Sequence, residues 1–237
     1  MKNLDEILAL CDGLMVARGD LAVEVPAEKV PIIQKMIIKK CNDAGKMVIT
    51  ATQMLESMIK SPVPTRAEVS DVANAILDGT DAIMLSEETT LGEYPLEAVS
   101  LMTRVAKEIE HSYLERKIVH IKNDEAREIT DSITESVVHT AKDVDAKAII
   151  ALTDTGFTAR MVSRYKPKQF IISLTPNEIT SHQLCLSFGC VPVQIPKIDT
   201  LEEMLKYIKT YCLKNEIAKK GDNIVITGRI PFNKKSG

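Results

Sequence analysis

The chain has 237 residues, 45% of them hydrophobic and 27% charged, a composition typical of globular proteins and not of disordered or fibrous ones. Its 30 basic and 33 acidic residues nearly balance, so no field of one sign would attract the whole molecule to nucleic acid or to an anionic membrane. Aromatic residues, at 4%, are too scarce for a surface that stacks single-stranded bases. The composition therefore predicts neither a nucleic-acid nor a membrane partner.

The cysteines and the N-terminal sequence indicate the cellular compartment in which the protein is expected. The five cysteines are odd in number and lack any Cys-x-x-Cys spacing, which favours reduced thiols over a disulfide framework or a zinc site. The first 13 residues lack the apolar core of a signal peptide, and no apolar run is long enough to span a membrane. A cytoplasmic location is expected. The four histidines show no metal-ligand spacing with a third partner and are interpreted as surface or packing residues.

Short β-branched runs alternate with amphipathic helical stretches, which predicts an α/β fold of parallel strands joined by crossover helices. The first part of the chain predicts a strand over 13–17, a polar loop over 18–23, a helix from about 27, a strand over 46–51, a helix over 66–77, a strand over 82–85 and a helix from 95 to about 113. Polar residues follow each strand, as in a (β/α)8 barrel or a doubly wound sheet, where sites lie at that edge. Three strands alone cannot close a barrel.

The alternation of predicted strands and helices is interrupted after this first part. Residues 114–128 are rich in charge without a clean period, which predicts a connector between domains. A helix over 129–143 and strands over 148–152, 170–174, 191–195 and 224–227 then predict a smaller α/β domain with a mostly parallel sheet. The predicted organisation is a barrel part over 1–113, a connector over 114–128 and a second domain over 129–237.

Three segments at predicted strand ends carry residues suited to chemistry. In MVARGDLAVE, Gly19 permits close backbone approach to an anion, and Asp20 offers a hard oxygen ligand for a divalent cation. In ITATQMLESM, the hydroxyl of Thr52 could order a proton or water beside that anion. In AIMLSEETTLGEYP, Ser86 ends the third strand. The plainer alternatives are a surface aspartate in a turn, a threonine chosen for β-propensity and a serine cap.

These segments occur in this order, with PTRAEVSDVANAILDGTDA between the second and third, and together they closely resemble the pyruvate kinase family. The resemblance covers nearly the whole chain and implies the last three strand–helix units of a (β/α)8 barrel followed by the C-terminal regulatory domain. It implies that Asp20 holds the catalytic magnesium and that the amides of Gly19 and Asp20 grip the substrate carboxylate. By the same matching, Arg18 shapes that pocket, Thr52 lies beside the carbon that is protonated, and Ser86 belongs to the polar network that brings the proton.

The resemblance implies a glycolytic phosphotransferase that moves the phosphoryl group of phosphoenolpyruvate to ADP, giving pyruvate and ATP. The implied cofactors are Mg²⁺ or Mn²⁺ and K⁺, and the implied assembly is a homotetramer. The family places a catalytic lysine and a second metal-binding glutamate upstream of the segment matching Asn3 to Leu8, and it continues into a further strand after residue 237. We therefore expect the chain to be a truncated and inactive fragment.

Departures from the family pattern leave some roles open. The family commonly has glycine where this chain has Ala22 and Glu87, which we interpret as variation within the family. In the second domain, LTDTGFTAR matches the family's sugar-phosphate effector loop, although Asp154 would place negative charge beside a phosphate, and an ordinary capped helix is the alternative. The candidate effector residues are Thr153, Thr155, Gly156 and Thr158. Arg66, Glu68 and Asp71 are interpreted from charge pattern as a solvated helix face, with a structural or interface role implied by the resemblance.

Two other functions compete with the enzyme hypothesis. The second domain could act as a non-catalytic module that binds a phosphorylated effector and supports oligomerisation. The chain could also belong to another magnesium-dependent barrel enzyme that handles oxoacid enolates, such as a lyase or an aldolase. The second domain and the long segment between the second and third motifs have no place in that last reading.

Overall fold

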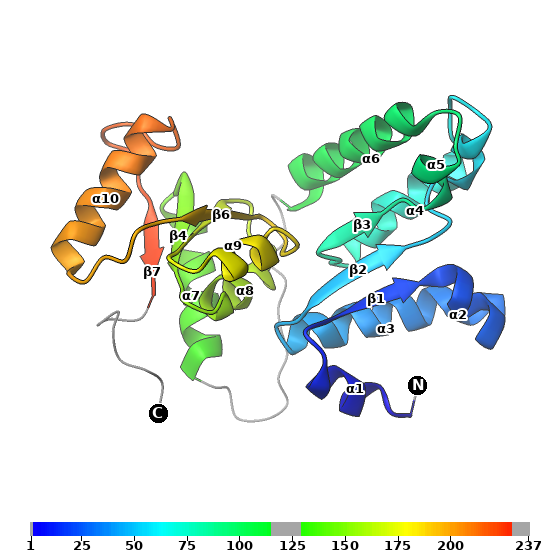
Figure 1. Ribbon diagram of the computed structural model, residues 1–237, viewed down its shortest axis with the longest axis horizontal. Coiled ribbons are helices and arrows are strands. Elements are labelled where there is room, and N and C mark those ends of the chain that lie inside the picture. The colour runs from blue at the N-terminus through cyan, green and yellow to red at the C-terminus, as the bar shows by residue number, and fades with distance from the viewer. Residues whose placement is uncertain (1, 115–128, 229–237) are drawn as a thin grey trace. The chain divides into compact units, whose positions relative to one another are not determined.

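The computed structural model describes residues 2–114 and 129–228, which fall into two compact units bounded as Met1–Lys117 and Ile118–Gly237. The predicted connector over 114–128 lies outside the described residues apart from Leu114, so its limits stay a prediction. Figure 1 shows helices and strands alternating along the chain within both units.

The first unit is built on three parallel strands in the order β1-β2-β3 (Figure 1). Its elements are α1 (Leu4–Leu10), β1 (Gly13–Ala17), α2 (Arg18–Glu24), the 3-10 turn η1 (Ala27–Lys29), α3 (Val30–Asp43), β2 (Met47–Ala51), the 3-10 turn η2 (Glu56–Ile59), α4 (Arg66–Leu77), β3 (Ala82–Met84), α5 (Glu87–Thr90), α6 (Pro95–Ile109) and the π-helical turn η3 (Glu110–Leu114). The three predicted strand–helix units are confirmed, and the bounds of α4 match the prediction.

The predicted polar loop over 18–23 is wrong, because this segment forms the helix α2. The segment holds no proline, and Asp20 lies in the first turn, where a carboxylate interacts favourably with the positive end of the helix dipole. The helices α1 and α5 were also absent from the prediction. The last helix is α-helical to Ile109 and continues as the π-helical turn η3 to Leu114, which agrees with the predicted end near residue 113.

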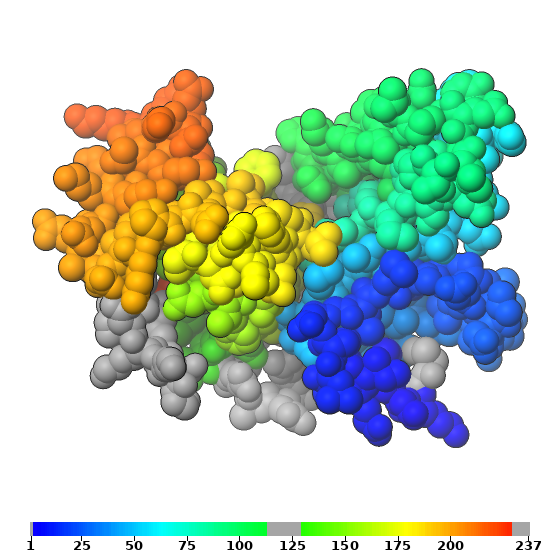
Figure 2. All heavy atoms as spheres, viewed as in Figure 1, coloured from blue at the N-terminus to red at the C-terminus, as the bar shows by residue number. Residues whose placement is uncertain are grey.

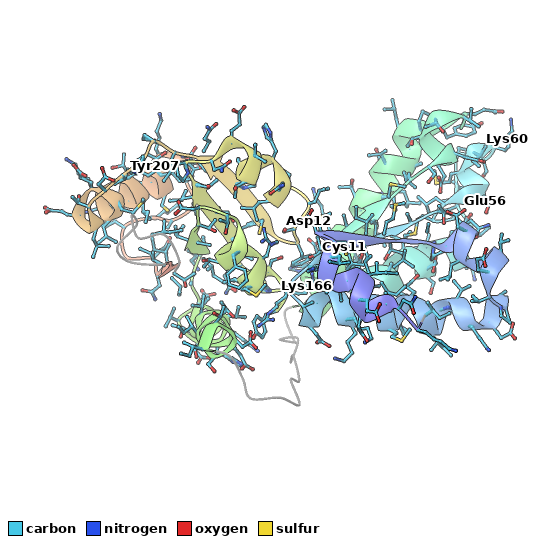
Figure 3. All side chains as sticks on the ribbon, turned by 60° about the horizontal axis from the view of Figure 1, so that its bottom comes forward. Cys11, Asp12, Glu56, Lys60, Lys166 and Tyr207 are labelled. Atoms are coloured by element: carbon cyan, nitrogen blue, oxygen red, sulfur yellow. The ribbon has the colours of Figure 1, made fainter. Side chains whose placement is uncertain are left out.

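Helix α1 is fixed at its end by a lysine from another part of the unit. The Nζ atom of Lys46 donates hydrogen bonds to the carbonyl oxygens of Leu8, of Ala9 at 3.1 Å and of Cys11 at 2.6 Å. An ammonium group at these carbonyls also complements the negative end of the helix dipole. Figure 3 shows Cys11 and Asp12 at the junction between α1 and β1, which this lysine therefore positions.

Apolar side chains from the crossover helices cover the sheet of the first unit. Ile38 and Cys41 of α3 are fully buried against Val16 and Val48 of the neighbouring strands. On the same helix Ile33 is buried, whereas Val30 and Ile37 are only partly buried. A second cluster joins η2, α4 and α6 through Met54, Leu55, Met58, Val72, Ala75, Ile76, Ala98 and Met102.

The second unit contains one parallel sheet with the strand order β6-β5-β4-β7. Its elements are α7 (Ile129–Asp143), β4 (Ala148–Leu152), α8 (Phe157–Ser163), β5 (Phe170–Thr175), α9 (Glu178–Leu184), β6 (Cys190–Gln194), α10 (Leu201–Lys214) and β7 (Val225–Thr227). The predicted smaller α/β fold with a parallel sheet is confirmed, and the bounds of α7 and β4 match the predictions.

Alternate residues of β4 serve two different cores. Ile149 and Ala151 belong to one apolar cluster, with residues of α7 and α8, while Ala148, Ile150 and Leu152 belong to another, with residues of α10. Successive side chains of a strand point to opposite faces, so a strand covered on both faces is apolar throughout. All five residues of β4 are accordingly buried.

Helix α10 is amphipathic and lies at the surface of the second unit, in orange in Figure 2. Met204, Ile208 and Cys212 are buried, and the polar face is exposed. None of the helices in the described part of the chain is long and apolar enough to cross a membrane. None of the five cysteines, all of which lie within the described residues, forms a disulfide bond.

Candidate active site

The three motif segments meet at one edge of the first sheet. The parallel register pairs Ala17 with Ala51 and Ala51 with Met84, so the carboxyl ends of β1, β2 and β3 lie side by side. The residues that follow these ends include Arg18, Thr52 and Ser86. The structure therefore brings together the three segments that the sequence assigned to a common edge.

Thr52 begins a turn with an unusual backbone. Thr52 has φ 67° and Gln53 has φ 53°, so two consecutive residues with side chains occupy the left-handed region. Each costs about 1–3 kcal/mol, and a β-branched threonine is rarely found there. The Oγ1 atom of Thr52 accepts a hydrogen bond from the amide of Gly19 at 2.8 Å and donates one to the carbonyl of Ala51 at 2.7 Å. Interactions with the rest of the fold must hold this turn.

Arg18 supplies those interactions. Its guanidinium donates from Nε and Nη2 to the carbonyl of Thr52 at 3.2 and 2.8 Å, and from Nη2 to the carbonyl of Gln53 at 3.1 Å. Nη1 forms an ion pair with Asp71 of α4 at 2.5 Å. Arg18 is only 8% exposed. The geometry thus gives Arg18 the task of holding the 52–53 turn, and direct contact with a substrate stays a prediction.

The interpretation of Glu68 and Asp71 as a solvated helix face is wrong, because both side chains have partners inside the unit. Thr65 and Glu68 form a capping box at the start of α4, and Glu68 also accepts from the amide and the hydroxyl of Ser57 at 2.6 and 2.5 Å. Burial alone would raise the pKa of Glu68, but the hydrogen bonds from Ser57 and Thr65 outweigh it and hold the pKa below its ordinary value of 4.5.

A Glu68→Gln variant should destabilise the first unit by about 1 kcal/mol near neutral pH, since a capping carboxylate is lost. Because the folded pKa is lowered, this contribution is fully present above the unfolded pKa and is lost as the pH falls below it. The difference in unfolding free energy between the two proteins should therefore stay constant from pH 7 down to the ordinary pKa of 4.5 and shrink as the pH falls further. Glu56→Gln is the matched control, since the side chain of Glu56 is exposed (Figure 3). A pH-independent difference would contradict the assignment.

Gly19 and Asp20 lie in the first turn of α2. A Cβ atom at Gly19 would meet Thr52 Oγ1 at 3.6 Å, an ordinary contact, so packing within the unit does not itself require glycine there. Asp20 is exposed, and its carboxylate makes no hydrogen bond or ion pair within the described residues. A carboxylate without a partner at this edge is chemically suited to a hard divalent cation.

The described residues offer no group of three or more His, Cys, Asp or Glu side chains that could hold a metal ion. A cation at Asp20 would therefore take its other ligands from water, from a bound substrate or from residues that the structure does not describe. Asp20 can supply one oxygen ligand to such a cation, but the described residues do not complete the site.

Ser86 precedes α5, and its amide donates to Glu88 Oε2 at 2.8 Å. Its carbonyl accepts from the hydroxyls of Thr89 and Thr90 at 3.2 and 3.1 Å, which closes the short turn. Glu88 is 2% exposed, and its other oxygen accepts from the amide of Leu55 at 3.0 Å. The segment after β3 is thereby tied to the segment after β2.

Family profiles match both parts of the chain. The profile of the pyruvate kinase barrel domain matches residues 1–99, and that of the pyruvate kinase alpha/beta domain matches residues 131–237. The chain belongs to the pyruvate kinase family. Its first unit is part of the family's barrel domain, and its second unit is the family's smaller α/β domain.

Several pyruvate kinases are similar to this chain along nearly its full length. The pyruvate kinase of Geobacillus stearothermophilus is 51% identical over 97% of the chain and 39% of its own length. That of Clostridium acetobutylicum is 47% identical over 98% of the chain and 49% of its own length. A crystal structure of a pyruvate kinase from Cryptosporidium parvum superposes with a TM-score of 0.90 and 41% identity, covering 98% of this chain and 48% of that one. The chain thus spans half or less of each of these relatives.

The two departures from the usual pyruvate kinase pattern cause no visible conflict. Ala22 lies inside α2 and is not among the residues with positive φ, so alanine is unstrained there. Glu87 is exposed at the start of α5, whereas its neighbour Glu88 is buried. The extra carboxylate is therefore not the one that lies between the strand ends.

The candidate effector loop of the pyruvate kinase α/β domain begins α8. Gly156 has φ 79°, and a Cβ atom there would lie 2.7 Å from Nη1 of Arg160, which donates to the carbonyl of Thr155 at 3.1 Å. The hydroxyl-bearing residues differ in exposure, since Thr153 is buried, Thr155 exposed and Thr158 half-buried. The structure accounts for the glycine, and binding of a phosphorylated effector stays a prediction.

Sequence reasoning missed Glu88, and it named Asp71 without its partner Arg18, although the structural role implied by the resemblance agrees with that ion pair. The capping box of Thr65 and Glu68 could have been found from its Thr-x-x-Glu spacing. No comparable local signal marks Glu88 or Asp71, because their partners lie 33 and 53 positions away along the chain.

Proposed function

We propose that this chain supplies the ends of β1, β2 and β3 to a pyruvate kinase active site, which transfers the phosphoryl group of phosphoenolpyruvate to ADP. One observation carries the proposal: the amide of Gly19 meets the hydroxyl of Thr52 at 2.8 Å, next to a carboxylate, Asp20, that has no partner within the described residues. An amide, a hydroxyl and a metal-binding carboxylate at one edge are what an anionic substrate and its cation require.

The residues have separate roles in this proposal. Asp20 would hold Mg²⁺ or Mn²⁺, which when bound neutralises the charge that develops on the transferring phosphoryl group. The amide of Asp20 would bind the substrate carboxylate, and the amide of Gly19 would join it by exchanging its hydrogen bond to Thr52 Oγ1 for one to the substrate. Thr52 would hold its hydroxyl beside the carbon that is protonated, and Ser86 would take part in the path of that proton. Arg18 would act through the 52–53 turn.

Membership of the family also supports proposals about the whole enzyme. K⁺ as a second cofactor, a homotetrameric assembly and a cytoplasmic location would follow from it. We further propose that the 237 residues expressed by themselves do not catalyse the reaction, since their described part offers one candidate metal ligand and no complete metal site.

A chimeric enzyme tests the proposal. In the Geobacillus stearothermophilus pyruvate kinase, to which the chain is 51% identical, the matching segment is replaced by this chain. We expect the chimera to convert phosphoenolpyruvate and ADP within about tenfold of the parent kcat, since the strand-end residues are proposed to be equivalent. The readout is pyruvate formation coupled to lactate dehydrogenase, with the parent as the positive control and the 237-residue chain as the inactive control.

An inactive chimera with the parent's fold and oligomeric state would contradict a catalytic role for these strand ends. That outcome would favour the non-catalytic alternative, an effector-binding and oligomerisation module, which binding of a phosphorylated sugar to the 237-residue chain would then examine. Activity in the isolated chain would contradict the proposal that it is incomplete.

A further inference from the structure

A buried carboxylate lies between two of the strand-end segments and has no role in the proposed chemistry. Glu88 in the short helix α5 is 2% exposed. Its Oε1 accepts from the amide of Leu55 at 3.0 Å, and its Oε2 accepts from the amide of Ser86 at 2.8 Å. Each oxygen therefore binds the backbone of a different loop, one following β2 and the other following β3.

The surroundings of Glu88 make these two bonds necessary. Within the described residues Glu88 forms no ion pair with a lysine, arginine or histidine, so the two amides are its polar partners. A buried carboxyl group that loses a partner is costly, because nothing replaces the hydration it gave up. The backbone of residues 88–92 is also tightly packed against itself, since a Cβ atom at Gly92 would lie 2.3 Å from the carbonyl oxygen of Glu88. Glu88 therefore has little freedom to turn away from the two loops.

The two anchored amides are close in sequence to the two proposed proton-handling residues. Leu55 comes three residues after Thr52, and its side chain is fully buried. The opposite end of the 52–55 turn is held by Arg18 through the carbonyls of Thr52 and Gln53. The turn is thus fixed at its start by a side chain from α2 and at its end by one from α5.

We propose that Glu88 is a positioning residue that sets the placement of the Thr52 and Ser86 hydroxyls relative to each other. The inference rests on the proposed function for its catalytic consequence, but its structural part stands on the two hydrogen bonds alone. A glutamine cannot replace Glu88, because one of its two terminal atoms is an NH₂ group that would face a backbone N–H. Glu88→Gln therefore keeps the shape of the side chain and loses one of the two connections.

The first test uses the full 237-residue chain and needs no catalytic activity. Amide hydrogen exchange, followed by NMR, should be slow at Leu55 and Ser86 in the unmodified chain. In Glu88→Gln it should accelerate at one or both of these amides by about tenfold or more, since a charge-assisted hydrogen bond is lost. The amides of β4 and β5 should be unchanged, as should every amide in the control Glu87→Gln, which alters the exposed neighbour. Rapid exchange at both amides in the unmodified chain would overturn the proposal without any variant.

The second test uses the active chimera. Glu88→Gln should lower kcat by about 10-fold to 100-fold, since a misplacement of about 1 Å has this effect, while KM for phosphoenolpyruvate stays within about threefold. Glu88→Asp keeps both acceptor oxygens at a shorter reach and should restore part of kcat. A fall in thermal stability with unchanged kcat would reduce Glu88 to a structural residue and overturn the proposal. If the unsubstituted chimera is inactive, the proposed function fails, and the exchange experiment alone then decides whether Glu88 joins the two loops.

Discussion

Asp20→Asn is expected to remove at least about 99% of the pyruvate kinase activity of the chimera while leaving its fold unchanged. A divalent cation contributes several kcal/mol to stabilising phosphoryl transfer, and each 1.4 kcal/mol corresponds to about a factor of ten in rate. Asp20 is exposed and has no hydrogen bond or ion pair among the described residues, so its replacement costs the fold little. The measurements are kcat at saturating Mg²⁺ and the affinity for Mn²⁺ by electron paramagnetic resonance.

The matched control for this variant lies on the same helix. Glu24 at the end of α2 is also exposed and is proposed to have no part in the site, so Glu24→Gln should retain activity and Mn²⁺ affinity. Retention of both properties in Asp20→Asn would remove Asp20 from the metal site. Loss of both in Glu24→Gln would point to a general effect of negative charge near α2.

Arg18→Met is expected to destabilise the first unit by about 2–4 kcal/mol and to abolish activity in the chimera. Removing one partner of a buried ion pair typically costs about 3–5 kcal/mol, and the lower figure allows for the Asp71 side chain, which is 38% exposed. The carbonyls of Thr52 and Gln53 lose their donors as well, so the left-handed turn loses the interactions that offset its backbone cost.

Residue-resolved hydrogen exchange is the suitable measurement, because a chain of two units need not unfold in one step. Amides of β1 and β2 should exchange faster in Arg18→Met, and those of β4 should not change. Arg104→Met is the control, since Arg104 is an exposed residue of α6 without a partner among the described residues. Equal protection of β2 in both variants would show that Arg18 does not support the turn.

The elements that the sequence predicted well are those with a clear period or a clear boundary signal. Helix α4 begins after Thr65, whose capping box fixes its first turn, and β4 is a run of five apolar residues, as is typical of a strand buried on both faces. Helix α2 was missed because Arg-Gly-Asp resembles a loop when composition alone is considered. In the structure the helix begins at Arg18, whose side chain turns back to bind the loop after β2.

The candidate site was predictable in its residue types and strand ends but not in its internal support. The family motifs lead to Asp20, Thr52 and Ser86, because each follows a strand in a parallel sheet. Nothing in the residue types of Thr52 and Gln53 indicates positive φ, since neither is glycine, asparagine or aspartate. Such a conformation is imposed by partners distant in sequence, and hydrogen bonds over 30 or more positions leave no local pattern.

The alternation along β4 also determines where this protein can accept a change in chain length. Adding or deleting one residue within β4 would exchange the sets of side chains that face its two cores, placing Ala148, Ile150 and Leu152 where Ile149 and Ala151 belong. The packing of both apolar clusters of the second unit would then be disrupted together. Insertions and deletions, whether natural or engineered, should therefore be tolerated only between the strands of this sheet. Within the strands we expect substitutions alone.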